Sequence, residues 1–178
     1  PPGGDPPTTW GWGGTAMTFY PGGDPSGPDD SFPGSLFATG NDQQQYLSEI
    51  SIPAPVLSGN LADLNTATTL QDFANIRDTL YDYITTDPDL DWEIPRAGLA
   101  YLPRQGSQTT DKLYFTWGVH MQELRYDPSH GWAELNLSDP QAAGLWQIGS
   151  GTDFQAYVTT DYLFDIPQAW ADAHTPDL

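Results

Sequence analysis

The feature that most constrains the fold of this chain is a series of short apolar runs, each closed by Pro or Gly. The 178 residues include 18 Gly and 17 Pro, which favour turns because Gly adopts positive φ and Pro fixes φ and lacks an N–H. Runs of about five residues between such turns have the usual length of strands. The sequence predicts strands at 16–20, 35–39, 46–52, 98–102, 112–117, 132–137, 145–148 and 162–166.

The stretch 58–95 departs from this strand pattern. Thr68 and the Gln three positions later form a capping box, which favours the start of a helix. Four apolar side chains then recur at helical spacing: Leu70, Phe73, Ile76 and Leu80. We expect a helix near 69–84 with these side chains facing inward, and a second short helix at 167–173.

The order of the strand-like runs repeats along the chain. The first unit reads AMTFYP, SLFATG and EISIP, and the second reads GLAYLP, LYFTWG and ELNL. The repeat matches these pairs of positions: Pro21 with Pro103, Leu36 with Leu113, and Glu49 with Glu134. A third echo, YLFDIP, lies at 162–167. Each unit is therefore predicted to be an antiparallel meander of three or four strands.

A repeated meander of this size resembles a blade of a β-propeller. The order of its phrases is similar to that in secreted bacterial propeller proteins of uncharacterised function, which are broadly similar to the propellers of carbohydrate-active enzymes. The resemblance covers roughly 15–55 and 97–167. It implies an all-β domain at 15–178, after a Pro/Gly-rich terminal segment at 1–14, with a helical insertion at 58–95.

The expected fold is an incomplete ring, because the chain holds two to three propeller-like blades and a closed propeller has about four or more. We therefore expect either a piece of a longer protein or a ring that other chains complete, including copies of this one. A β-sandwich with one helical insertion is the alternative fold.

The charge of the chain limits its partners. It carries 24 acidic and 5 basic residues, a formal charge of −19, while charged residues make up only 16% of the total. The imbalance thus comes from scarce Lys and Arg, which disfavours nucleic-acid binding and a polybasic membrane anchor. No run reaches the about 18 apolar residues of a membrane span. The absence of Cys excludes disulfides, and the low Lys content favours a secreted, extracellular protein.

Acidic side chains alternate in the segment DPDLDWE. They are Asp87, Asp89, Asp91 and Glu93. Alternation places carboxylates on one side of an extended segment, as a calcium ion prefers. The EF-hand pattern fails because its sixth position, a Gly in that motif, is Trp92 here. Calcium is therefore a possible cofactor, and a solvated acidic loop is the alternative.

Two further acids are candidates for glycoside hydrolysis, which uses a pair of carboxylates. Glu123 lies in the loop after the run 112–117, and Asp30 lies in the loop PGGDPSGPDD. Glu49 and Glu134 share one repeat position, which favours a structural role for both. Loop acids are more commonly solvated turn residues, so hydrolysis and simple binding both remain open.

Aromatic and imidazole side chains are the candidates for ligand contacts. Trp10, Trp12 and Trp117 could stack on sugar rings, although packing between sheets is the alternative for Trp117. His120 and His130 lie near Glu123 in GVHMQELRYDPSH, where they could bind a ligand or a divalent metal, or form a polar hairpin loop.

Together these patterns favour an extracellular module that binds a polysaccharide or hydrolyses its glycosidic bonds. The sequence leaves open whether the protein is an enzyme. The alternative function is a non-catalytic structural subunit whose sheet is completed by other chains.

Overall fold

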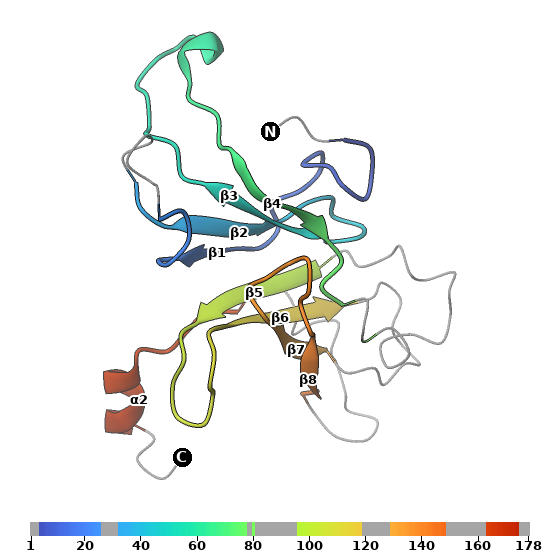
Figure 1. Cartoon of the computed structure of the whole chain (residues 1–178), viewed down its shortest axis with the longest axis vertical. Helices are drawn as coiled ribbons and strands as arrows, with labels where there is room; N and C mark the ends of the chain where they lie inside the picture. The colour runs from blue at the N-terminus through green and yellow to red at the C-terminus, as the bar shows by residue number, and fades with distance from the viewer. Residues whose placement is uncertain are drawn as a thin grey trace.

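The computed structural model describes residues 4–25, 32–77, 80, 96–118, 129–148 and 163–174. In this part of the chain, eight strands form two antiparallel four-stranded sheets, each in chain order (Figure 1). Sheet A contains β1 (Met17–Tyr20), β2 (Ser35–Thr39), β3 (Leu47–Ser51) and β4 (Thr69–Ala74). Sheet B contains β5 (Arg96–Leu102), β6 (Lys112–Gly118), β7 (His130–Ala133) and β8 (Ala143–Trp146). The prediction of an all-β fold built from repeated antiparallel meanders is confirmed.

Two short helices accompany the sheets. The 3-10 helix η2 (Leu61–Asp63) lies between β3 and β4, and α2 (Gln168–His174) follows sheet B near the predicted second helix. In the described ranges no helix is long and apolar enough to cross a membrane. The described strands close neither a barrel nor a propeller.

The prediction of a helix near 69–84 is wrong for its first part, because Thr69–Ala74 is strand β4 and pairs with β3. A short apolar run is compatible with both the helical and the strand periodicity. Here the segment forms a strand because β3 supplies hydrogen-bond partners for its backbone. The Ser48 hydroxyl also donates to the Gln71 carbonyl at 2.7 Å. Ile76 and Leu80 are buried as predicted, whereas Leu70 is exposed. Residues 78–79 and 81–95 lie outside the described residues.

Other strand boundaries also differ from the prediction, and β5 begins at Arg96, two residues before the predicted start at 98. The run predicted at 132–137 forms strand only as β7, which ends at Ala133. Residues 136–139 turn instead, with the Asp139 N–H donating to the Asn136 carbonyl. The strand predicted at 145–148 is β8, which begins and ends two residues earlier, at Ala143–Trp146. The predicted strand at 162–166 is absent over its described part, 163–166.

The core lies between the two sheets. Phe37 and Leu47 from sheet A and Leu113, Phe115 and Trp117 from sheet B are all buried in one apolar cluster. Side chains alternate between the faces of a strand, so each central strand sends every second residue into this layer. Burying such side chains contributes roughly 1.5–3 kcal/mol each, which makes the contact between the sheets the main source of stability.

The first strands of the two sheets also meet directly (Figure 1). The rings of Tyr20 and Tyr101 lie with centroids 5.0 Å apart. The Tyr101 backbone N–H donates to the Thr18 hydroxyl at 2.9 Å. This contact fixes β5 beside β1 at one edge of the core.

A polar clamp joins the sheets near the opposite edge, at β4. The Gln71 amide nitrogen donates to the Leu135 carbonyl at 2.9 Å, and its amide oxygen accepts from the Leu137 N–H at 2.8 Å. The same nitrogen donates to the Glu49 carboxylate at 2.6 Å, which also accepts from the Ser35 hydroxyl at 2.5 Å. Gln71 thus forms hydrogen bonds both with a buried carboxylate of sheet A and with the backbone of the segment that follows β7 in sheet B.

Replacing this clamp is expected to destabilise the protein strongly. Gln71→Leu leaves the Leu137 N–H, the Leu135 carbonyl and one Glu49 oxygen without their partner, at a cost of about 3 kcal/mol. Chemical denaturation measures the free energy of unfolding. The matched control is Gln168→Leu on the exposed helix α2, which should change that free energy by less than about 0.5 kcal/mol. Equal effects of the two substitutions would contradict the role of the clamp.

Candidate functional site

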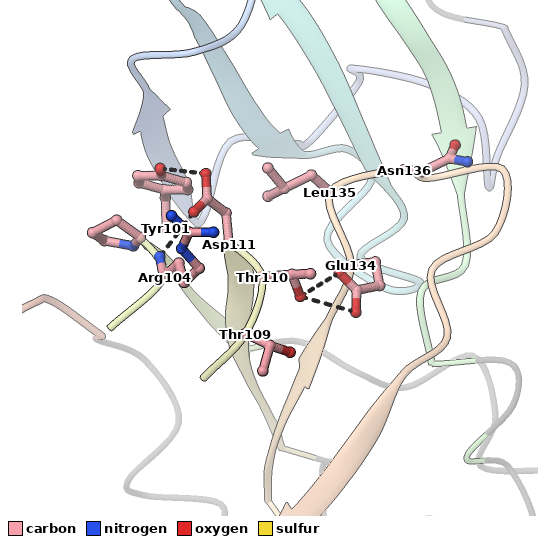
Figure 2. A pocket seen from close by; sticks show the side chains of 9 residues that line it. Tyr101, Arg104, Thr109, Thr110, Asp111, Glu134, Leu135 and Asn136 are labelled. Atoms are coloured by element: carbon pink, nitrogen blue, oxygen red, sulfur yellow. Dashed lines mark hydrogen bonds between the residues drawn. The ribbon is translucent and has the colours of Figure 1, made fainter. Parts of the chain in front are cut away.

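An open groove of about 680 Å³ lies beside the hairpin that joins β5 and β6. Figure 2 shows its lining, which comes from the end of β5, the hairpin loop and the residues that follow β7. We call it the hairpin groove, and its lining residues are Tyr101, Pro103, Arg104, Thr109, Thr110, Asp111, Glu134, Leu135 and Asn136.

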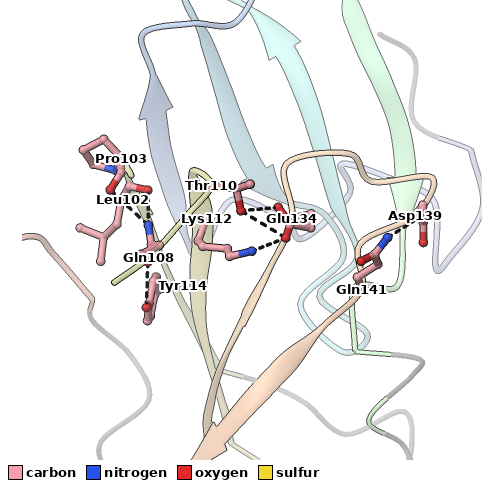
Figure 3. A network of polar contacts seen from close by, with 9 residues as sticks. All are labelled: Leu102, Pro103, Gln108, Thr110, Lys112, Tyr114, Glu134, Asp139 and Gln141. Carbon is pink, nitrogen blue, oxygen red and sulfur yellow. Dashed lines mark hydrogen bonds and ion pairs between the residues drawn. The ribbon is translucent and has the colours of Figure 1, made fainter. Parts of the chain in front are cut away.

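Hydrogen bonds within the loop hold the hairpin groove in shape. The Gln108 amide nitrogen donates to the carbonyls of Leu102 and Pro103 at 3.3 and 3.1 Å, and its oxygen accepts from the Tyr114 hydroxyl at 3.0 Å (Figure 3). The Gln108 N–H closes a turn onto the Gln105 carbonyl. The loop turns at Gly106, whose φ of +55° suits Gly because it lacks a Cβ.

The first carboxylate of the groove, Asp111, spans the base of the hairpin. It accepts from the Tyr101 hydroxyl at 2.9 Å and from the Arg104 N–H at 2.8 Å. Burial, followed by the hydrogen bond and negative charge of Asp111, raises the pKa of Tyr101 to about 12. The Tyr101 hydroxyl therefore stays protonated and remains a donor at neutral pH.

The second carboxylate, Glu134, is held from the neighbouring strand. It accepts from the Thr110 hydroxyl at 3.1 and 3.3 Å and pairs with the Lys112 ammonium (Figure 3). The Lys112 ammonium also lies 4.1 Å from the centroid of the Trp132 ring. Both acids of the groove are thus fixed acceptors, an arrangement better suited to orienting a polar ligand than to moving protons.

Glu49 and Glu134, matched in the sequence, have different surroundings. Glu49 is 6% exposed and serves the clamp between the sheets, whereas Glu134 is partly exposed and lines the groove. In sheet A, Glu49 pairs with Phe37, and in sheet B the residue that corresponds to Phe37 is Tyr114, which pairs with Trp132. The structural equivalent of Glu49 is therefore Trp132. Glu134 lies two residues after Trp132 and thus on the same side of the sheet.

The three predicted ligand-binding tryptophans lie in different environments. Trp12 is 86% exposed on a turn, with a φ of +61°. Trp10 is half-buried, and its ring centroid lies 4.7 Å from that of Phe73. Trp117 is 0% exposed and belongs to the core between the sheets. Trp12 is accessible to a ligand, whereas Trp117 fulfils the packing alternative and is not part of the site.

His130 is buried at the start of β7. Its ring stacks on Trp146 with centroids 3.8 Å apart, and its Nδ1 lies 2.7 Å from the Ser129 hydroxyl. Burial lowers the pKa of His130 to about 4. The ring is therefore neutral at physiological pH and acts as a packing and hydrogen-bonding group.

The remaining predicted site residues lie outside the described residues. They are the candidate catalytic acids Glu123 and Asp30, the candidate ligand residue His120, and the candidate calcium ligands Asp87, Asp89, Asp91 and Glu93. Within the described ranges, no group of three or more His, Asp or Glu side chains is placed to hold a metal ion. Calcium binding stays a prediction.

The sequence reasoning missed the hairpin groove as a site. Its residues lie in the turns PRQGSQTTD and ELNLSDP, which are separate in the chain and carry no motif. The sequence did contain one indication of the groove, because both polar turns are expected at the same end of the predicted meander. Side chains from two such turns can meet only when the strands between them pair in the observed register.

Comparisons of the chain with models of protein families, with curated proteins and with solved structures found no match.

The buried His130 predicts a loss of stability in mild acid. Its pKa is about 4 in the folded protein and 6.5 in an unperturbed side chain. Between these values the unfolded chain binds a proton that the native state does not bind. The contribution of His130 to stability is therefore complete above pH 6.5 and is lost as the pH falls toward 4.

The test compares free energies of unfolding at pH 7 and pH 5. His130→Gln should reduce the difference between the two values, and His174→Gln on the exposed helix α2 should preserve it. NMR titration of the His130 ring should give a midpoint near 4. A midpoint near the ordinary value of about 6.5 would contradict the prediction.

Proposed function

We propose that this protein is a secreted carbohydrate-binding module and that the hairpin groove holds the glycan. The observation that carries the proposal is an open, mixed polar groove of about 680 Å³ with fixed acceptors and accessible donors. This volume falls within the range of about 300–1,000 Å³ typical of small-ligand sites. A short oligosaccharide segment fits an open groove because the rest of the polymer can extend beyond either end.

The chemistry of the lining matches sugar hydroxyls, each of which can donate and accept. Asp111 and Glu134 are oriented by protein donors, and each carboxylate oxygen has more than one lone pair. Arg104, Thr109 and Asn136 add side-chain donors at the rim. The Tyr101 ring provides an apolar surface, against which the C–H face of a sugar can pack.

The same hydrogen bonds favour binding over hydrolysis within the groove. A glycosidase needs one carboxyl group that is protonated at the working pH and a second that is free to act as base or nucleophile. Glu134 is paired with the Lys112 ammonium, and Asp111 accepts hydrogen bonds from Tyr101 and from the Arg104 backbone, so neither carboxylate is free to act as base or nucleophile. We therefore propose a non-catalytic role for this groove.

Secretion and calcium belong to the same proposal. The scarcity of Lys and Arg supports an extracellular location. The alternating acids at 87–93 support a structural calcium ion, which binding assays can test by comparing calcium with a chelator. A structural subunit is the second candidate function, favoured by the exposed apolar side chains of Met17 and Phe19 on β1.

Binding to a glycan array, followed by calorimetry with the best ligand, tests the proposed function. Thr109→Val and Arg104→Ala should each weaken binding about tenfold, the equivalent of one lost hydrogen bond at about 1.4 kcal/mol. Thr66→Val is the matched control on an exposed loop of sheet A and should leave the affinity unchanged. Trp12→Ala measures any contribution from that exposed ring.

Two results would argue against the groove as the site. One is the absence of affinity for any glycan in calcium and in chelator. The other is a glycan affinity that Thr109→Val and Arg104→Ala leave unchanged while Trp12→Ala abolishes it.

A further inference from the structure

The turn that follows β7 carries the one Asn-X-Ser/Thr sequence of the chain in which X is not Pro. It reads Asn136-Leu137-Ser138. This tripeptide is the acceptor motif for N-linked glycosylation, and it is used where the Asn lies at the surface of a secreted protein. Whether the motif can carry a glycan therefore depends on the structure around Asn136.

The motif begins inside the strand predicted at 132–137, but the structure places it in an exposed turn. Strand β7 ends at Ala133, and the Asp139 N–H donates to the Asn136 carbonyl at 3.1 Å. Asn136 and Ser138 are exposed, whereas Leu137 between them is 3% exposed. The turn thus directs both polar residues of the motif to solvent and buries the apolar one.

The clamp between the sheets holds the backbone on both sides of Asn136. The Leu135 carbonyl and the Leu137 N–H both bond to the Gln71 amide, at 2.9 and 2.8 Å. Figure 2 shows the Asn136 side chain directed away from Thr110, on the other side of the hairpin groove. The orientation of this side chain toward solvent is therefore a fixed feature of the fold.

The two polar atoms of the Asn136 amide have different roles. Its Oδ1 accepts from the Ser138 hydroxyl at 2.7 Å and from the Ser138 N–H at 3.1 Å. Its Nδ2 makes no hydrogen bond to any residue that the structure describes. An amide nitrogen carries two hydrogens, and glycosylation replaces one of them and leaves the oxygen unchanged. The folded turn can therefore carry a glycan without losing a hydrogen bond.

We propose that Asn136 is a site of N-linked glycosylation. The donor is an oligosaccharide whose first sugar carbon is bonded to a lipid pyrophosphate. A base of the transferring enzyme takes one proton from Nδ2, which forms the N–C bond to that carbon. The bond from the same carbon to the pyrophosphate oxygen breaks, and the lipid pyrophosphate leaves with the electron pair. The product amide keeps one N–H, and its glycan extends from the rim of the hairpin groove, which Asn136 lines.

Glycosylation at Asn136 rests on the proposed secretion of the protein, because the acceptor motif is used in exported chains. The test uses the full chain, secreted from a eukaryotic host under a leader of that host. The result is then independent of native export and of glycan binding by the groove. Intact mass spectrometry should show a species heavier than the polypeptide by the mass of an N-linked glycan. A peptide N-glycosidase should remove this excess mass and convert Asn136 to Asp, which peptide mapping detects.

Substitutions within the motif test whether the motif itself directs the modification. Ser138→Ala removes the hydroxyl and should abolish the excess mass, whereas Ser138→Thr keeps a hydroxyl and should retain it. Asn136→Gln should also abolish the excess mass. Both positions are exposed, so the three variants should share the circular dichroism spectrum of the parent chain.

The exposed turn at Asn60 provides a matched positive control. The tripeptide Asn60-Leu61-Ala62 differs from the motif only at its third residue, and Asn60 and Ala62 are both exposed. The Asn60 Oδ1 accepts from the Ala62 N–H at 3.1 Å, as the Asn136 Oδ1 accepts from the Ser138 N–H. Ala62→Ser, combined with Asn136→Gln, should therefore gain the excess mass and show that the host modifies an exposed turn of this kind.

Two results would overturn the proposal. One is a parent chain that has only the mass of the polypeptide while the Ala62→Ser control gains the excess mass, because the host is then competent and Asn136 is not an acceptor. The other is an excess mass that persists when Asn136→Gln is the only substitution, because the glycan is then attached elsewhere.

Discussion

The placement of the two sheets depends on one buried polar contact, the Glu49 carboxylate with the Gln71 amide. A buried carboxylate is costly unless hydrogen bonds replace its water, and Ser35 and Gln71 provide these bonds. Gln71 can do so only in strand β4 paired with β3. Its remaining amide groups then fit the backbone at Leu135 and Leu137. The side chain that provides a hydrogen bond to the Glu49 carboxylate thereby also fixes the position of the segment that follows β7.

That segment forms one wall of the hairpin groove. Glu134 and Asn136 lie at either side of Leu135, so the clamp that holds the sheets together also positions two groove residues. The opposite wall is a hairpin loop stiffened by Gln108 and Asp111. A site built this way has little freedom to rearrange, which suits recognition of a repeating polar ligand by a preformed surface.

The hairpin groove lies at an end of sheet B, at the β5–β6 hairpin. Equivalent positions of the repeat serve different purposes in the two sheets. Phe19 is exposed while its equivalent Tyr101 packs on Tyr20 and lines the groove.

The sequence by itself determined the class of fold, the existence of two meanders and most strand positions, because Pro and Gly end strands through local backbone restrictions. It also determined the repeat that makes Leu36 equivalent to Leu113. Only the tertiary structure decided that 69–74 is a strand and that Arg104 and Asn136 line one groove. Residues 69–74 form a strand because β3 is available to pair with them. Arg104 and Asn136 meet because the register of the strands of sheet B brings two distant turns together. Such outcomes are set by long-range pairing and by the hydrogen bonds of buried groups, which local sequence patterns do not encode.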